Sequence, residues 1–377
     1  MSRAVHRERA DRGFTLVELT LVIIIILILV AIAIPAYGSL TYSSGRSGSA
    51  SAVQNALESA RDAAVRAGPG RDAAAIFLGG EDGRVRAVTG VVEAQILDDA
   101  GGVDVLRDIF VPAPGTEAIQ LPRGWSARGY ARAATLVSSV SGTPGTRPEL
   151  ADNAEWYEQT YTSDREDGHW VYPETEFYER AEPDSGAARQ TFMVRFEGGT
   201  GRYQSTATAK ALYIEPAPTI AFRRSGTIYD RFRVDRAEDL GRFVRRVLAD
   251  PSLSQNDRRD LLGDISADTV LVGPVGQVAV YKEERLANSI GADGLNRGTD
   301  TFYRAIDGSV TDPEYDVGLF GGVADPAIIN ARISQWIRGS SLTTGALPAS
   351  ETSDARIFQV SRYLGSPTEV ERLVEGQ

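Results

Sequence analysis

The sequence contains no cysteine and only two histidines, His6 and His169. Without cysteine the chain cannot form disulfides, thiolate metal sites or a cysteine nucleophile, and two histidines are too few for a multi-histidine metal site. Basic residues are also in the minority, because 40 Lys and Arg face 51 Asp and Glu and leave a net charge of -11. Such a charge balance repels phosphate backbones, so we expect no nucleic-acid partner.

Recognisable catalytic motifs are missing as well. The sequence has no P-loop, no G-x-S-x-G elbow and no H-E-x-x-H pair. The glycine-rich stretch 198–201 is better explained by a turn than by a dinucleotide-binding loop. His169 beside Trp170 is a candidate general base, since imidazole titrates near neutral pH, but a surface or half-buried histidine next to an aromatic strand is the simpler interpretation. We therefore expect no enzyme and no cofactor.

The longest apolar run lies near the N-terminus and follows a basic leader. Residues 1–12 hold four arginines, Glu8 and Asp11, which gives a local excess of 4 − 2 = +2. Residues 14–34 then read FTLVELTLVIIIILILVAIAI. As a helix this run is about 31 Å long at about 1.5 Å per residue, and a bilayer core is about 30 Å thick. We expect a transmembrane helix over 14–35, with a cytoplasmic N-terminus and a translocated body.

The small residue Gly13 stands before the apolar run. A secretory signal peptide has its cleavage site after the apolar stretch, so that cleavage releases the mature protein from it. Cleavage at Gly13 would instead remove only the leader, residues 1–13, and leave the membrane anchor on the product. We therefore expect the anchor to survive maturation.

The residues around this glycine resemble the processing site of type IV prepilins and pseudopilins. The stretch is Arg12-Gly13-Phe14-Thr15-Leu16-Val17-Glu18-Leu19, with a glycine before the cut, a phenylalanine after it and an acid at the fifth mature position. Pro35 lies at mature position 35 − 13 = 22, where pilin-like helices commonly carry a proline that kinks the helix. The resemblance covers about 50 residues. It implies cleavage by a prepilin peptidase between Gly13 and Phe14 and N-methylation of Phe14.

Glu18 is the most informative residue of this segment, because a carboxylate in hydrocarbon costs roughly 2.5 to 3.5 kcal/mol at mid-span and less near an end. The resemblance implies that Glu18 pairs with the N-terminal amine of a neighbouring pilin or pseudopilin subunit as both enter a filament at an inner-membrane assembly platform. The alternative is that Glu18 reaches the headgroups from the first helical turn, where the helix dipole also favours a negative charge.

Residues 36–67 continue from the anchor into the body. Gly38, Gly45 and Gly48, with serines between them, lower helix propensity and predict a flexible link over residues 36–50. From residue 50 small apolar residues recur at helical spacing, so we expect an amphipathic helix that packs against a sheet. The glycines and proline at 68–70 end it.

The remainder, residues 68–377, predicts a β-rich extracytoplasmic body that either stays whole or divides near residue 231. Short segments rich in Thr, Val, Ile and aromatics predict strands; they are 75–78, 84–88, 91–97, 191–196, 206–214, 219–222, 227–229, 269–272 and 277–281. Thr89-Gly90 predicts a hairpin turn, and 270–281 a second hairpin. Helices are predicted over about 236–249, about 325–338 and 367–374. The fold class is therefore α+β. The resemblance to prepilins implies a pilin-like arrangement, with a long N-terminal helix on antiparallel sheets.

Three further features concern the body. The helix end at 60–68 is similar to that of H-type minor pseudopilins of type II secretion and minor pilins of the FimT kind, with an enlarged C-terminal domain here. Asp293, Asn296 and Asp300 are weak candidate calcium ligands, although a solvated turn-rich loop explains the same residues. Aromatic residues at 156–178 suit either an interface or core packing, and core packing is the commoner reason.

These observations predict a structural, non-enzymatic subunit of a type IV pilus or a type II secretion pseudopilus. It would cross the bacterial inner membrane once, with its body in the periplasm or in a filament. The alternative is a membrane-anchored periplasmic binding or enzymatic domain that uses a pilin-type anchor only for delivery. A plain signal-anchored protein with an uncut leader is a third, weaker interpretation.

Overall fold

The computed structural model describes residues 16–79, 84–100, 103–131, 169–171, 173, 190–204, 210–216, 240–254, 257–258, 261–262, 266–290, 333–338 and 353–370. Contacts divide the chain into two compact units, Met1–Ser47 and Gly48–Gln377. Helix α1 spans Leu16–Ala67. Its N-terminal part is the described portion of the first unit, and the rest of α1 and all the described strands belong to the second unit.

Helix α1 runs without interruption for 52 residues, so the predicted flexible link over 36–50 is wrong. The helix also continues through Pro35. Beyond Pro35 no proline interrupts the backbone hydrogen bonds of the helix. The hydroxyl side chains donate to backbone carbonyls of the same helix and so do not favour a non-helical backbone. Thr41 Oγ1 donates to Tyr37 O at 3.0 Å, and Ser43 Oγ donates to Leu40 O at 3.0 Å. Low propensity is a weak preference that a long helix overrides.

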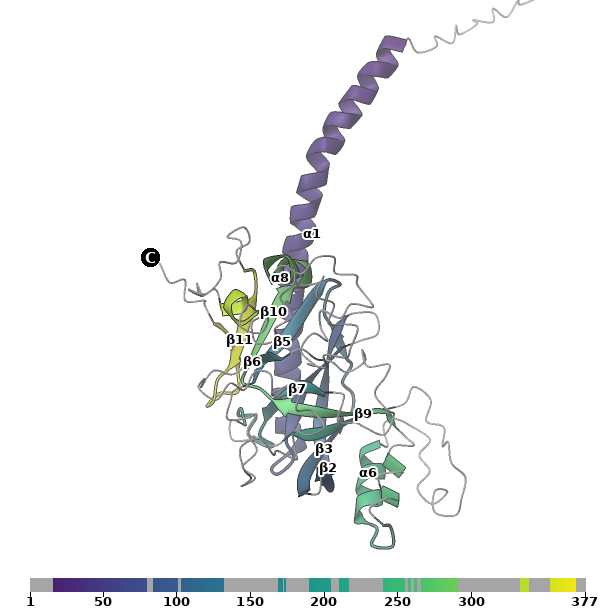
Figure 1. The fold of residues 1–377 in the computed structure, drawn as a ribbon, viewed down its shortest axis with the longest axis vertical. Coiled ribbons are helices and arrows are strands. Elements are labelled where there is room, and N and C mark those ends of the chain that lie inside the picture. Colours follow the sequence, from purple (N-terminus) through teal and green to yellow (C-terminus); the bar gives the residue numbers. More distant parts are fainter. Residues whose placement is uncertain are drawn as a thin grey trace, which may run out of the picture. The chain divides into compact units, whose positions relative to one another are not determined.

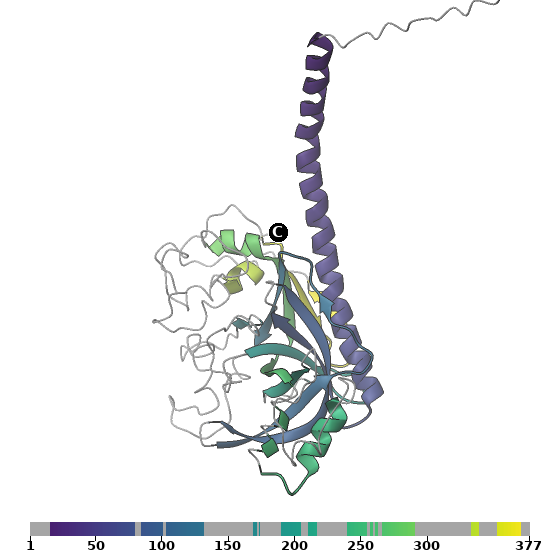
Figure 2. The same cartoon turned by 90° about the vertical axis from the view of Figure 1, so that its right-hand side faces the viewer.

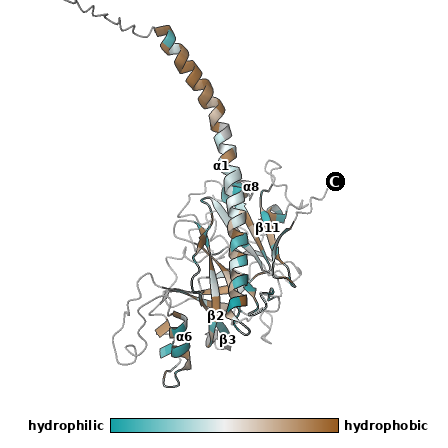
Figure 3. Ribbon diagram, turned by 180° about the vertical axis from the view of Figure 1, so that it is seen from behind, coloured by the Kyte–Doolittle hydropathy of each residue, from teal (hydrophilic) through white to brown (hydrophobic). Residues whose placement is uncertain are grey.

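The last twenty residues of α1 form the amphipathic segment that the spacing predicts. Figure 3 shows mainly apolar residues in the N-terminal part of α1 and mixed hydropathy in its C-terminal part. Val53, Leu57, Ala60 and Ala64 are fully buried. Ser59 Oγ lies 3.0 Å from the Oγ1 of Thr89 in β2 (Val85–Ala100), so this segment packs on the sheet that contains β2.

Within the described residues, the larger sheet has seven strands in the order β1-β7-β9-β8-β3-β2-β4, and β1 also pairs with β2. Six of the strands therefore form a closed ring of paired strands, with β4 attached to β2. Besides β2, the strands are β1 (Ala73–Gly79), β3 (Val103–Pro112), β4 (Ile119–Gln120), β7 (Gln190–Phe196), β8 (Ala211–Pro216) and β9 (Ser266–Pro274). The pairs β3–β8 and β7–β9 are parallel, and the others are antiparallel.

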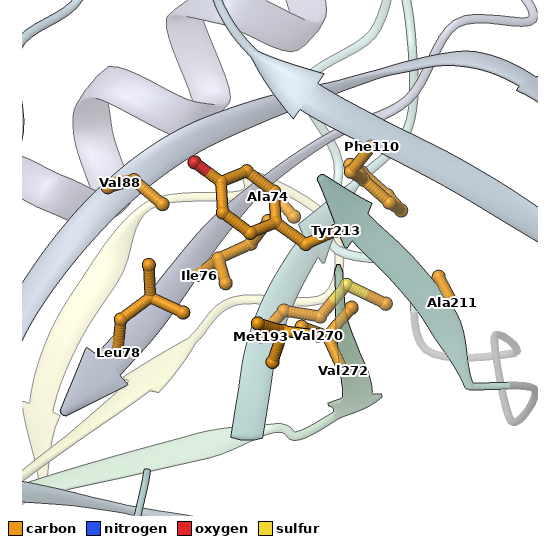
Figure 4. Packing of buried hydrophobic residues seen from close by; sticks show 10 residues of the cluster. All are labelled: Ala74, Ile76, Leu78, Val88, Phe110, Met193, Ala211, Tyr213, Val270 and Val272. Carbon is orange, nitrogen blue, oxygen red and sulfur yellow. The ribbon is translucent and has the colours of Figure 1, made fainter. Parts of the chain in front are cut away.

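The ring encloses an apolar core made from alternate residues of its strands, because successive side chains of a strand lie on opposite faces. Figure 4 shows this cluster: Ala74, Ile76, Leu78, Val88, Phe110, Met193, Ala211, Tyr213, Val270 and Val272. The intervening residues of β1 are also buried, so both faces of this strand are covered. Burial raises the pKa of Tyr213 well above its ordinary value, with a smaller contribution from Glu215.

The second sheet has five antiparallel strands in the order β12-β11-β10-β5-β6. They are β5 (Trp125–Ala131), β6 (His169–Val171), β10 (Gln277–Lys282), β11 (Arg356–Val360) and β12 (Pro367–Val370). It packs on the outside of the ring, where Gly129 of β5 meets Phe192 of β7. A Cβ at Gly129 would lie 2.5 Å from Phe192 Cγ, and Phe192 stacks on Phe77 with ring centroids 4.8 Å apart. Glycine at 129 therefore lets the two sheets approach.

Helices border the sheets (Figures 1 and 2). Helix α6 (Leu240–Ala249) confirms the helix expected over about 236–249 within the described residues, and it lies beside β2. Helix α8 (Glu283–Ile290) follows β10 directly and was not expected. Residues 333–338 are helical, within the predicted 325–338. The α+β class is thus confirmed. The position near residue 231 lies outside the described residues, and β8 and β9 on either side of it pair with each other.

Both predicted hairpins are wrong in the pairing of their strands. Thr89-Gly90 lies inside β2, which continues from residue 85 to residue 100. Gly90 is needed for close packing, since a Cβ there would lie 2.7 Å from Ile76 Cδ1. Strands β9 and β10 belong to different sheets and do not pair with each other. Two apolar segments separated by a glycine give the same sequence pattern whether the two strands pair with each other or belong to different sheets.

The predicted helix over 367–374 is also wrong, because residues 367–370 form strand β12. Pro367 is the first residue of this strand, at the edge of its sheet, where a missing N–H costs no ladder hydrogen bond. Gly365, with φ of 64°, makes the turn from β11. The pair Ser366-Pro367 is compatible both with the start of a helix and with the start of an edge strand.

Candidate functional site

The N-terminal part of α1 is the most exposed apolar surface of the described chain. Every Leu, Ile and Val from Leu16 to Ile34 is exposed. Within the described residues, α1 is the helix long and apolar enough to cross a membrane. Residues of this size exposed all round a helix are stable only in lipid or against other apolar helices.

Glu18 lies in the first turn of this helix, and its side chain is exposed. Next to it, Thr20 Oγ1 donates to Leu16 O at 2.8 Å, which satisfies the hydroxyl inside the helix. Glu18 is the one charged residue of the described apolar run 16–34. Gly13 and Phe14 lie outside the described residues. Pro35 lies within the helix, two residues before the tyrosine at position 37.

The C-terminal end of α1 is held by the glycine-rich turn at 198–201, which the sequence correctly predicts to be a turn. Gly199 N donates to Ala64 O at 2.9 Å and thereby satisfies one of the last carbonyls of the helix. A Cβ at Gly201 would lie 2.8 Å from Val65 Cγ2, so the turn is in close contact with the helix. The reason for three glycines in four residues is thus a helix cap supplied from 199 − 64 = 135 residues away.

An ion-paired cluster fixes this turn to the sheet. Asp72 Oδ1 accepts a hydrogen bond from Gly198 N at 2.9 Å, and Asp72 Oδ2 lies 2.8 Å from Arg195 Nε. Arg195 Nη2 lies 2.6 Å from Asp108 Oδ2, and its guanidinium stands 5.5 Å from the centroid of the Phe110 ring. These contacts join the segment between α1 and β1, and the turn that caps α1, to β3 and β7. Sequence analysis did not find them, since the partners are far apart in the chain.

A second buried polar cluster lies in the five-stranded sheet. Arg128 is fully buried, and its Nε donates to Tyr281 OH at 2.9 Å while its Nη1 donates to Trp170 O at 3.1 Å. Burial raises the pKa of Tyr281, and the positive charge of Arg128 opposes the shift only partly. The cluster is closed by Trp336, which packs edge-on against Tyr281 with centroids 5.9 Å apart. It is therefore a structural element of the sheet.

The other residues singled out in the sequence are mostly outside the described part. Asp293, Asn296 and Asp300 lie there, so calcium binding stays a prediction. His169 of β6 is described by its backbone alone, which pairs with that of Ala131 in β5. Of the aromatic group, Trp170 is 2% exposed and packs on Tyr130 with ring centroids 5.1 Å apart. Core packing is thus the reason for this one aromatic residue.

Comparison with known proteins bears on the N-terminal segment. Residues 9–34 match the model of the prokaryotic N-terminal methylation motif. No curated protein and no solved structure is significantly similar to the chain. The motif indicates a protein processed as a prepilin and supports a type IV pilin-like protein. The motif and the apolar helix together are consistent with membrane anchoring.

Proposed function

We propose that this chain is a structural, non-enzymatic subunit of a type IV pilus or a type II secretion pseudopilus, with the role of a minor pilin or pseudopilin. The observation that carries the proposal is the methylation motif over 9–34 at the start of an exposed apolar helix. That helix continues, without a break, into the segment 48–67 that packs on the sheet of the body. A single helix thus connects the exposed apolar segment 16–34 to a folded domain.

Processing follows from the order of the N-terminal residues. A prepilin peptidase cuts between Gly13 and Phe14, and the new amino group of Phe14 is methylated. The cut removes the basic leader and retains the apolar run. Before assembly the chain is a single-pass protein of the bacterial inner membrane, with a cytoplasmic N-terminus and a periplasmic body, because basic residues near a span resist translocation.

Assembly depends on Glu18, four residues after the new N-terminus. A carboxylate among leucines and isoleucines is costly in lipid, so pairing with the amine of Phe14 on an adjacent subunit favours entry into the fibre. The exposed apolar side chains of 16–34 then pack against the same segments of neighbouring subunits. The acid therefore sets the position of one subunit relative to the next.

The test compares Glu18→Ala with Glu58→Ala in cells that carry the prepilin peptidase and assembly machine. Glu58 is a matched control, an exposed carboxylate on the same helix that accepts a hydrogen bond from Gln54 Nε2 at 3.0 Å. We expect both variants to insert in the membrane and to have Phe14 as first residue by N-terminal sequencing and intact mass. We expect Glu18→Ala to be lost from the fibre fraction and Glu58→Ala to be retained.

Two results would overturn the proposal. A mature protein that begins with Met1 would show that the leader is not processed. Normal assembly of the Glu18→Ala variant would favour the second candidate function, a periplasmic binding or enzymatic domain delivered by a pilin-type anchor. The size of the body, residues 48–377, motivates that second candidate.

A further inference from the structure

A small pocket lies between helix α6 and the β2–β3 pair, with a volume of about 370 Å³. Figure 1 shows α6 beside these strands. The lining comes from the segment before β1, from β2, from the end of β3 with the turn after it, and from α6. All the residues that line it are among the described residues. Small-molecule sites measure about 300 to 1,000 Å³, so the pocket is large enough for a small ligand.

Glu93 of β2 holds two arginines in place at this pocket. Its side chain is 6% exposed, and its carboxylate accepts a hydrogen bond from Arg71 Nη2 and lies 2.9 Å from Arg245 Nη1. A carboxylate removed from water is costly unless cations pair with it. Pairing with both arginines therefore fixes two guanidinium groups next to one carboxylate.

Gly241 lets α6 come close enough for this contact. A Cβ at residue 241 would lie 2.8 Å from Glu93 Cδ, so a side chain there would push the helix away from the carboxylate. Arg245 lies four residues later and therefore on the same face of α6. Glycine lowers helix propensity, and the close approach to Glu93 accounts for it here. The packing of α6 on β2 thus sets the position of Arg245.

The two arginines keep donors for a further anion. Their side chains are 40% exposed for Arg71 and 51% exposed for Arg245. Each guanidinium has five N–H donors in a planar fork, and Glu93 engages only some of the ten. Arg71 Nε also donates to Val92 O at 3.4 Å. The remaining N–H groups belong to partly exposed side chains, so an anion in the pocket can reach them.

The charge of this group favours a single carboxylate as the ligand. Arg71, Arg245 and Glu93 together carry 2 − 1 = +1, on a chain whose net charge is -11. One carboxylate neutralises that charge, and its two oxygens match the planar fork of a guanidinium. Arg242, which is exposed, also lines the pocket, so the lining as a whole attracts anions.

The rest of the lining is mainly apolar. Val111, Pro112 and Leu240 belong to it. The hydroxyl of the lining, Thr116 Oγ1, donates to Ala113 O at 2.7 Å, so its proton is already in a hydrogen bond. The ligand that fits this lining therefore has a carboxylate at one end and a short apolar group at the other.

We propose that this pocket binds a small organic carboxylate that carries an apolar group. The carboxylate accepts hydrogen bonds from the remaining N–H groups of Arg71 and Arg245, and the apolar group lies against Pro112 and Leu240. The inference goes beyond the filament function, because a ligand site on the body depends neither on processing at Gly13 nor on the pairing of Glu18.

The first test varies the ligand. The detergent-solubilised full chain is titrated in a calorimeter with 3-phenylpropionate, a carboxylate with a short apolar group. We expect it to bind at least tenfold more tightly than 3-phenylpropanamide, its neutral amide, because charged acceptors bind the arginines more strongly. Acetate, which lacks the ring, should also bind at least tenfold more weakly. Inorganic phosphate should bind more weakly than 3-phenylpropionate, since its second negative charge would lie near Glu93.

The second test compares two arginines of α6. Arg245→Gln removes one of the two positioned charges and should weaken binding of 3-phenylpropionate at least tenfold. Arg246 is an exposed arginine of the same helix outside the lining, so Arg246→Gln should leave the affinity within about twofold of the parent chain. Both side chains are exposed, and both variants should unfold at the same urea concentration as the parent. The comparison of acid and amide needs no variant, so it decides the matter even if Arg245→Gln does not fold.

The outcomes are distinct from those of the filament test. The site is overturned if 3-phenylpropionate does not bind, if the amide or acetate binds equally well, or if the two arginine variants bind it alike. Tighter binding of phosphate than of 3-phenylpropionate would contradict the carboxylate as the ligand class. These results leave the filament function standing, and normal assembly of Glu18→Ala would leave the pocket standing.

Discussion

Residues 16–47 and 48–67 of α1 share one helical backbone, but their side chains have opposite surroundings. Leu27 is 62% exposed in the first segment, and Leu57 is fully buried in the second. Residues 16–34 of the first segment are mainly large aliphatic residues, and the second segment buries mainly alanines, which allow a sheet to approach closely. Both segments form a helix. Side-chain size decides whether the apolar side chains of that helix are covered by the sheet of the same chain or must be covered by other molecules.

The strongest test of this difference is a matched truncation in the two segments. Leu57→Ala should lower the free energy of unfolding of the body by about 2 to 5 kcal/mol, since it leaves a cavity in a packed interface. Leu27→Ala removes the same atoms from an exposed position and should leave that free energy unchanged. Urea unfolding of the detergent-solubilised chain, followed by tryptophan fluorescence, measures both. Equal losses would show that the two segments do not differ in what they stabilise.

Glycine substitutions extend the comparison to the backbone. Gly129→Ala places a methyl group against the Phe192 ring and should destabilise the body by about 1 to 3 kcal/mol through overpacking. Gly38→Ala meets nothing within 4 Å and should favour the helix by about 1 kcal/mol. Unfolding of the body reports the first change, and helical circular dichroism after heating reports the second. A stabilising Gly129→Ala would contradict the close contact between the sheets.

Alkaline pH should weaken the body through its buried tyrosines. Burial raises the pKa of Tyr281 above its ordinary value of 10.0, so the unfolded chain loses this proton at a lower pH than the folded chain does. The stabilisation is complete below pH 10 and decreases by about 1.4 kcal/mol per pH unit as pH rises through the folded pKa. Unfolding curves at several pH values measure this slope. Tyr281→Phe should reduce the slope.

The smallest effect concerns single hydroxyl groups. Ser59→Ala removes the 3.0 Å hydrogen bond to Thr89 and should cost about 0.5 to 1.5 kcal/mol. Ser43→Ala removes only a bond to a carbonyl of its own helix and should change body stability by less than about 0.5 kcal/mol. Thermal unfolding distinguishes the two. A larger effect for Ser43 would show that the first segment contributes to the stability of the body.

Local sequence was sufficient where one pattern has one structural solution. The apolar run, its basic leader and the glycine before it predicted the anchor and its motif. Alternating β-branched and aromatic residues predicted strands at 191–196 and 277–281, both of which form. The same local rules failed at Gly90 and at residues 367–370. At these positions a residue typical of turns or helix caps makes a contact with a segment distant in the sequence. The neighbouring residues in the sequence do not indicate that contact.

The sequence by itself determined the membrane-compatible helix, its processing motif and the α+β class, because these depend on composition and spacing along a continuous stretch. Only the tertiary structure decided that six strands close into a ring, that residues 198–201 cap α1, and that Arg71, Glu93 and Arg245 share one pocket. The physical reason is that pairing and charge contacts depend on which distant segments lie side by side, and many partners satisfy the same local pattern.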